Sequence, residues 1–102
     1  MLGKWKLSVN TPFGDEIYTF DLFSDKEGYY GIIGNDKGFL KSTDIKVSDG
    51  KFISWTEETK TPIDATIKFD ASVEGNLMVG TVKIDEYLTV GFEGVLEQCS
   101  MI

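Results

Sequence analysis

The sequence has no arginine and no histidine, and it has one cysteine and two prolines in 102 residues. Without arginine there is no guanidinium fork to grip phosphates or guanine edges, and a net charge of −7 repels nucleic acid and anionic membranes. Without histidine, the chain lacks the usual proton shuttle and the commonest metal ligand. A lone cysteine excludes an intramolecular disulfide. We therefore expect no nucleic acid, membrane, metal or cofactor as a partner.

Long apolar runs are missing too, and the longest fall far short of the roughly 20 residues that a membrane-spanning helix needs. Strand-like alternation begins at Gly3, which leaves no room for a signal peptide, so a cytoplasmic protein is expected. Hydrophobic residues make up 41% and aromatics 13%, a globular composition. This length suits one core, and we expect a single domain, residues 1–102.

Apolar and polar residues alternate along most of the chain, which predicts half-buried β-strands and little or no helix. The alternation is clear in KWKLSV at residues 4–9, and in STDIKVS it places Thr43, Ile45 and Val47 on one face. Short turn signals separate the runs, and Asp49-Gly50 is typical of a two-residue hairpin. The pattern predicts an all-β fold of about eight antiparallel strands.

The two halves of the sequence resemble each other. The matched residues are Trp5 and Trp55, Thr11-Pro12 and Thr61-Pro62, Phe20 and Phe69, and Gly31 and Gly80. We interpret them as two similar four-strand units, about 1–50 and 51–102, each of which needs the other to bury its apolar face. Closing the eight strands into an up-and-down barrel hides every edge, and a two-sheet sandwich is the competing arrangement.

The sequence GKW at residues 3–5 resembles the Gly-x-Trp signature of calycins, the superfamily of lipocalins, fatty-acid-binding proteins and avidin-like barrels. The chain more closely resembles the small calycin-like domain found alone or appended to bacterial amidohydrolases. That resemblance covers residues 3–94, through GKWKLSVNTPFG, Gly31, VSDGKFISW, VEGNLMVGTVK and GFEG. It implies an eight-stranded antiparallel up-and-down calycin-like barrel without a settled activity, so no catalytic residue is carried over. The arginine of lipocalins and fatty-acid-binding proteins is absent, which disfavours a fatty-acid carrier.

In a barrel, one face of each strand points inward. The expected inward residues are Trp5, Leu7, Val9, Tyr18, Phe20, Leu22, Tyr29, Ile33, Ile45, Val47, Ile53, Trp55, Ile63, Ile67, Phe69, Met78, Val82, Val90 and Phe92. They make either a solid core or the lining of a pocket, because an eight-stranded barrel has room for side chains or one small ligand. A pocket lined by Tyr18, Tyr29, Trp55, Met78 and Phe92 would suit a small apolar or cationic ligand. The leading hypothesis is a non-enzymatic ligand-binding barrel.

Glu57 has the same strand parity as Trp55, and in the repeat it falls where Leu7 lies. An inward carboxylate is costly unless it is paired or near water. Either the strand ends or bulges there and Glu57 is solvated, or Glu57 is a rim carboxylate of the ligand pocket that binds a cation or acts as a lone general base. Nothing nearby in the sequence offers a second catalytic group, so we do not expect an enzyme.

Apolar residues also fall on the expected outer face: Ile17, Phe23, Tyr30, Ile32 and Phe52. Single apolar residues on a surface are normal, whereas a contiguous patch marks an interface. The alternative function is therefore an interaction, accessory or homodimerising module with a filled barrel and no ligand.

Overall fold

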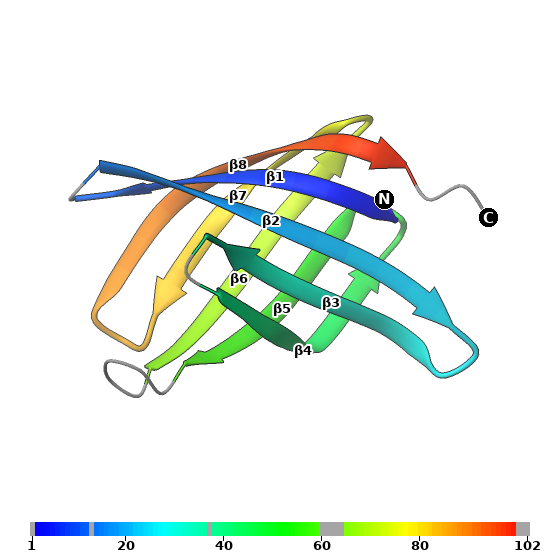
Figure 1. The fold of residues 1–102 in the computed structure, drawn as a ribbon, viewed down its shortest axis with the longest axis horizontal. Coiled ribbons are helices and arrows are strands. Elements are labelled where there is room, and N and C mark those ends of the chain that lie inside the picture. Colours follow the sequence, from blue (N-terminus) through cyan, green and yellow to red (C-terminus); the bar gives the residue numbers. More distant parts are fainter. Residues whose placement is uncertain (1, 13, 37, 60–64, 100–102) are drawn as a thin grey trace.

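The computed structural model describes residues 2–12, 14–36, 38–59 and 65–99, and these form a closed antiparallel barrel (Figure 1). The strands are β1 (Gly3–Thr11), β2 (Gly14–Asp25), β3 (Gly28–Asn35), β4 (Gly38–Ser48), β5 (Phe52–Thr59), β6 (Ala65–Glu74), β7 (Leu77–Ile84) and β8 (Leu88–Cys99). Each strand pairs with the next, and β8 pairs with β1. The expected up-and-down barrel is confirmed and the sandwich is wrong. Within the described ranges, no helix has the length and apolar character to cross a membrane.

The β4–β5 turn has the expected hairpin geometry. Asp49 and Gly50 have φ angles of 55° and 65°, and the amide of Lys51 donates to the carbonyl of Ser48 at 3.0 Å. Two successive residues with positive φ match the right-handed twist of the flanking strands, and Asp-Gly is a favoured sequence for that turn. The hairpin predicted at Asp49-Gly50 is confirmed.

The residues matched between the two halves have corresponding ladder partners. The corresponding pairs are Trp5–Phe20 with Trp55–Phe69, and Leu22–Gly31 with Ala71–Gly80. The second Thr-Pro match, Thr61-Pro62, and the expected inward residue Ile63 lie outside the described residues. The shared register is compatible with an internal duplication, which itself stays a prediction.

The core fills the barrel with stacked aromatic rings. The ring of Trp55 lies parallel to that of Phe20 at 4.2 Å and to that of Phe69 at 4.6 Å, and Phe92 meets it edge-on at 6.2 Å. Offset stacks and edge-on contacts are the favoured aromatic geometries. The buried apolar residues are Trp5, Leu7, Val9, Phe20, Leu22, Ile33, Ile53, Trp55, Phe69, Met78, Val82 and Phe92.

Two inward glycines let side chains fill the space that a Cβ would need. A Cβ on Gly31 would lie 2.8 Å from Cε1 of Phe20, and one on Gly94 would lie 2.7 Å from Cδ2 of Leu7. Real Cβ atoms do not approach heavy atoms so closely. Interior side chains therefore pack directly onto the backbone of the barrel wall at these two points.

β4 contains a bulge that the alternation did not predict. Asp44 has a φ of 55°, and the register against β5 shifts between Thr43 and Lys46. One extra residue in a strand reverses the face, inward or outward, that each preceding residue of that strand takes. Thr43, expected on the same face as Ile45, is exposed and pairs with Thr56, while Ser42 takes the buried place at 5% exposure. The expectation for Thr43 was wrong for this reason.

The bulge marks the point where β4 and β5 begin to pair. Their ladder starts at Thr43–Thr56 and continues toward the Asp49-Gly50 turn. The preceding segment, Gly38–Ser42, pairs with β3. Of the described residues in β5, none forms a ladder pair with Gly38–Ser42. Glu57 lies directly beyond the first pair, at the point where the two strands separate.

Gly80→Ala should destabilise the barrel much more than Gly91→Ala. A Cβ on Gly80 would lie 1.9 Å from the carbonyl oxygen of Asp70, so β6 or β7 must move, whereas the nearest atom to one on Gly91 is 3.9 Å away. Forcing atoms into a packed site typically costs about 1–3 kcal/mol, and exposed substitutions stay within about 0.5 kcal/mol. Urea unfolding measures both, and equal losses in the two variants would contradict the packing at Gly80.

Candidate functional site

Glu57 is the buried acidic group of the barrel interior. Its side chain is 1% exposed, and Oγ of Ser42 on β4 donates a hydrogen bond to its Oε2. Glu57 points inward because it lies on the same face of β5 as the buried residues Ile53 and Trp55. Glu57 is therefore not solvated, and the interpretation that the strand ends or bulges at this residue was wrong. Its hydrogen-bond partner, Ser42, was not anticipated.

The Glu57 carboxyl is incompletely satisfied. Its Oε1 and the indole Nε1 of Trp55 are both buried, and neither makes a hydrogen bond of good geometry. Burial raises the pKa of Glu57 from 4.5 to about 7, and the hydroxyl of Ser42 and the indole of Trp55 partly oppose that rise. The indole N–H thus lies near enough to favour the charged carboxylate, although it is not aligned for a full hydrogen bond. Near neutral pH, Glu57 exists in both protonation states.

The two tyrosines expected in the ligand pocket lie near opposite ends of the barrel. Tyr18 pairs with Leu7 toward the β1–β2 turn, and Tyr29 pairs with Ser24 beside the β2–β3 turn. Tyr18 is half-buried, and its hydroxyl donates to Glu16; burial first, and then this hydrogen bond, raises the pKa of Tyr18 to about 12. Tyr29 has the inward parity but is 42% exposed. The structure does not bring the two phenols together.

The other expected pocket residues are core residues. Trp55, Met78 and Phe92 are at most 3% exposed, and Trp55 and Phe92 belong to the aromatic stack. Glu57 is the polar member of this buried group, and Ser42 anchors it. The predicted pocket residues therefore separate into a packed interior around Glu57 and two tyrosines at the rims.

The outer face of β2 and β3 gathers four of the five residues expected at an interface. Phe23 opposes Tyr30, and Ile32 lies one position further along the same face of β3. Ile17 lies on β2 toward the β1–β2 turn and is 48% exposed. Phe52 is exposed as well, but it lies on β5, paired with Ser48 and Ser72, away from the other four.

One residue of β4 extends this apolar face, and the alternation did not single it out. Phe39 is 79% exposed and covers Gly34, whose Cβ would lie 2.4 Å from Cδ1 of Phe39. Leu40, the next residue, is 37% exposed but has the inward parity of its buried ladder partner, Ile33. A hollow of about 400 Å³ is lined by Phe23, Tyr30, Gly31, Ile32, Phe39, Leu40 and Lys41. The sequence signal available for this surface was Phe39 directly after Gly38.

A hydrogen-bonded turn fixes one end of the apolar face. The hydroxyl of Tyr30 donates to Asp25 at 2.6 Å, and the amide of Glu27 donates to the same carboxylate at 2.7 Å. The hydrogen bond from Tyr30 is the main cause that lowers the pKa of Asp25. An Asp that bonds the backbone two residues on stabilises a tight turn. The ring of Tyr30 is thereby held in place on the outer face.

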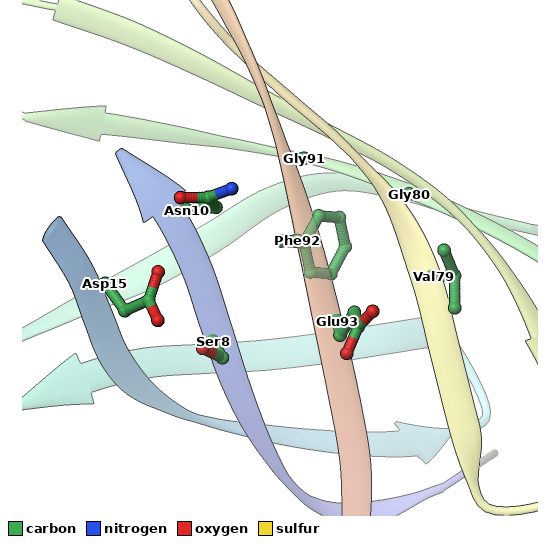
Figure 2. Close-up of a pocket in the computed structure, with 8 residues that line it drawn as sticks. All are labelled: Ser8, Asn10, Asp15, Val79, Gly80, Gly91, Phe92 and Glu93. Atoms are coloured by element: carbon green, nitrogen blue, oxygen red, sulfur yellow. The ribbon is translucent and has the colours of Figure 1, made fainter. Parts of the chain in front are cut away.

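A more polar hollow of about 360 Å³ lies elsewhere on the barrel surface and is shown in Figure 2. Ser8, Asn10 and Asp15 come from β1 and β2, and Val79 and Glu93 come from β7 and β8. Gly91 lines the hollow without a side chain, and a Cβ there would have its nearest neighbour 3.9 Å away. Asp15 and Glu93 are exposed, so the groove offers solvated carboxylates and no buried polar group to fix a ligand.

Metal binding finds little support in the side chains that the structure describes. Among them, no three His, Cys, Asp or Glu residues cluster closely enough to hold an ion. Glu57 is a single carboxyl whose bonded neighbour is a serine hydroxyl. Among the described residues, the interior thus offers the carboxyl of Glu57 and the incompletely bonded indole N–H of Trp55, and the outer face offers apolar contact area.

Glu57→Gln should stabilise the protein at alkaline pH and change little below about pH 4.5. The pKa of Glu57 is raised in the fold, so its contribution to stability is complete below the unfolded value of 4.5 and is lost as the pH rises through about 7. Across that window, the wild type should lose on the order of 2–3 kcal/mol relative to the variant. Urea unfolding at several pH values measures the difference.

Glu58→Gln is the matched control, because Glu58 is the next residue along β5 and is exposed. This variant removes a carboxylate from the same strand without the burial that Glu57 has. Ser42→Ala should raise the pKa of Glu57 further, because the Ser42 hydroxyl stabilises the charged carboxylate. If the free-energy difference between Glu57→Gln and the wild type varied with pH no more than that of Glu58→Gln, Glu57 would not titrate in the barrel.

Comparison of this chain with protein-family models, with curated proteins and with solved structures found no match in any of the three.

Proposed function

We propose that the protein is a non-enzymatic interaction module that associates with a second copy of itself through the outer face of β2, β3 and β4. One contrast carries the proposal: the stack of Phe20, Trp55 and Phe69 fills the interior, while the apolar hollow opens outward. Packed interiors leave no room for a ligand without rearrangement. Exposed contiguous apolar surface marks protein contact sites.

The composition of the face supports contact with a protein. Phe23, Ile32 and Phe39 are 49%, 41% and 79% exposed, so each has area to lose on association. Aromatic side chains dominate the energetics of protein interfaces. The chain as a whole carries 17 acidic residues and ten lysines. A mostly apolar face limits the like charge that two copies of this acidic chain bring together.

The closed eight-stranded barrel is compatible with the calycin-like domain suggested by the GKW motif. We extend the proposal to that family because Trp5 is fully buried at the start of β1, where the motif places a Trp that closes one barrel end. The absence of arginine separates this chain from lipocalins and fatty-acid-binding proteins. Its cytoplasmic location remains part of the proposal.

A small cationic or apolar ligand inside the barrel is the second candidate function. The observation that favours it is the pair of buried, incompletely bonded polar atoms, Oε1 of Glu57 and Nε1 of Trp55. A ligand with a donor for the carboxyl would need the aromatic stack to open. Titrating the protein with tetramethylammonium or with a hydrophobic dye, while following Trp fluorescence, tests this candidate. An unchanged spectrum would exclude both probes as interior ligands.

Ile32→Glu and Phe23→Glu should each convert a wild-type dimer to a monomer. Each places two carboxylates, one from each copy, in the apolar contact, where burying unpaired charge is unfavourable. Sedimentation velocity at protein concentrations from about 5 to 500 μM, chosen around a micromolar dissociation constant, measures the shift. Val79→Glu is the control, because Val79 is 55% exposed on β7. A wild type that stays monomeric throughout this range would overturn the proposal.

A further inference from the structure

A charged row crosses the apolar face at its centre. In the ladder, Asp21 of β2 opposes Ile32 of β3, and Ile32 opposes Lys41 of β4. Neighbouring strands lie about 4.8 Å apart, so the Asp21 and Lys41 backbones flank that of Ile32 at roughly equal distances. In the part of the chain that the structure describes, the ion pair found is Lys46–Asp44, and neither Asp21 nor Lys41 takes part in one.

We propose that this row specifies a symmetric dimer whose two-fold axis lies in the contact plane, parallel to β3, and passes over Ile32. This inference rests on the proposed self-association and adds its geometry. Rotation about that axis exchanges the β2 and β4 sides of the face. Asp21 then faces Lys41 of the partner subunit, and Lys41 faces Asp21 of the partner subunit. The face is self-complementary in charge, as a two-fold contact requires.

The competing in-plane axis is excluded by the same row. An axis perpendicular to β3 would leave β2 over β2 and β4 over β4. It would place Asp21 against Asp21 of the partner subunit and Lys41 against Lys41 of the partner subunit. Like charges facing each other across an interface are strongly unfavourable. The order acidic, apolar, basic along one row thus selects the orientation and favours a second copy over an unrelated partner.

Shape agrees with this axis. The next row of the ladder places Thr19 and Phe39 on either side of Gly34. The rotation brings the Phe39 ring over the Thr19 side of the other copy. There, a second hollow of about 470 Å³ is lined by Lys4, Ile17, Thr19, Asp21, Gly34, Asn35, Asp36 and Phe39. The most exposed ring of the face thus meets a hollow with apolar Ile17 in its wall.

Lys4 is the other charged neighbour of Asp21, which it opposes across β1 and β2. It lies outside the three-residue row, on the side away from Ile32. The rotation carries it beyond the β4 side of the other copy. Lys4 therefore faces neither Asp21 of the partner subunit nor Lys41 of the partner subunit across the axis.

The test uses the variants D21K and K41D and their double variant, D21K/K41D, in sedimentation velocity. D21K carries only positive charge in the row, and K41D carries only negative charge, so each should self-associate at least about tenfold more weakly than the wild type. The double variant restores complementary pairs and should recover wild-type association. A mixture of the two single variants should form a heterodimer more tightly than either single variant forms a homodimer.

D70K and K68D are matched charge changes on exposed positions of β6, and they should leave association unchanged. A wild-type dimer that is indifferent to D21K and K41D, or singles that do not pair when mixed, would overturn the proposed axis while self-association stands. A monomeric wild type would instead overturn the proposed function together with the axis. Circular dichroism of each variant establishes that it is folded.

Discussion

The parallel stack of Phe20, Trp55 and Phe69 is the contact on which the rest of the molecule depends. It joins β2, β5 and β6 across the interior, so strands that are not neighbours in the sheet are held at a fixed separation. An eight-stranded barrel is narrow enough for such side chains to fill it. Because aromatic rings occupy the core, our proposal places binding by this protein on its outer surface.

Glu57 is the exception within this packed interior, and the matched position in the first half of the sequence offers a comparison. At the corresponding place in the first half lies Leu7, which is fully buried. A leucine there would be satisfied by packing alone, whereas the carboxyl needs Ser42 and retains an unbonded oxygen. Buried, incompletely satisfied polar groups cost stability. The second half is therefore less stabilised at this position than the first half. The same burial of the carboxyl raises the pKa of Glu57.

Much of the fold was readable from the sequence because period-two alternation and turn residues are local signals. Trp5, Leu7 and Val9 are buried as their alternation predicts, and Asp49-Gly50 forms its hairpin. The sequence around Asp44 did not indicate the bulge. An Asp on the exposed face of a regular strand would have the same neighbours, whereas this Asp has a positive φ.

The candidate sites were only partly predictable for the same reason. Ser42 became the partner of Glu57 through the parity change at the bulge, which no local pattern announces. The outer row of Asp21, Ile32 and Lys41 depends on the register of three strands, so it could be recognised only once the ladders were known. Alternation indicates which face of a strand a residue lies on, but not where it lies along the barrel axis. Tyr18 and Tyr29 were therefore assigned to one pocket although they lie near opposite ends.

The late start of the β4–β5 ladder has a consequence for how water reaches the interior. Ser42 and Glu57 lie at the apex where the two strands part, just beyond the first pair at Thr43–Thr56. Small separations of the Gly38–Ser42 segment from β5 break the Ser42–Glu57 hydrogen bond but no described β4–β5 ladder pair. Local opening of this kind needs less free energy than global unfolding. We therefore expect Glu57 to exchange its proton with solvent when these two strands part briefly, without opening of the aromatic stack or of the other strand pairs.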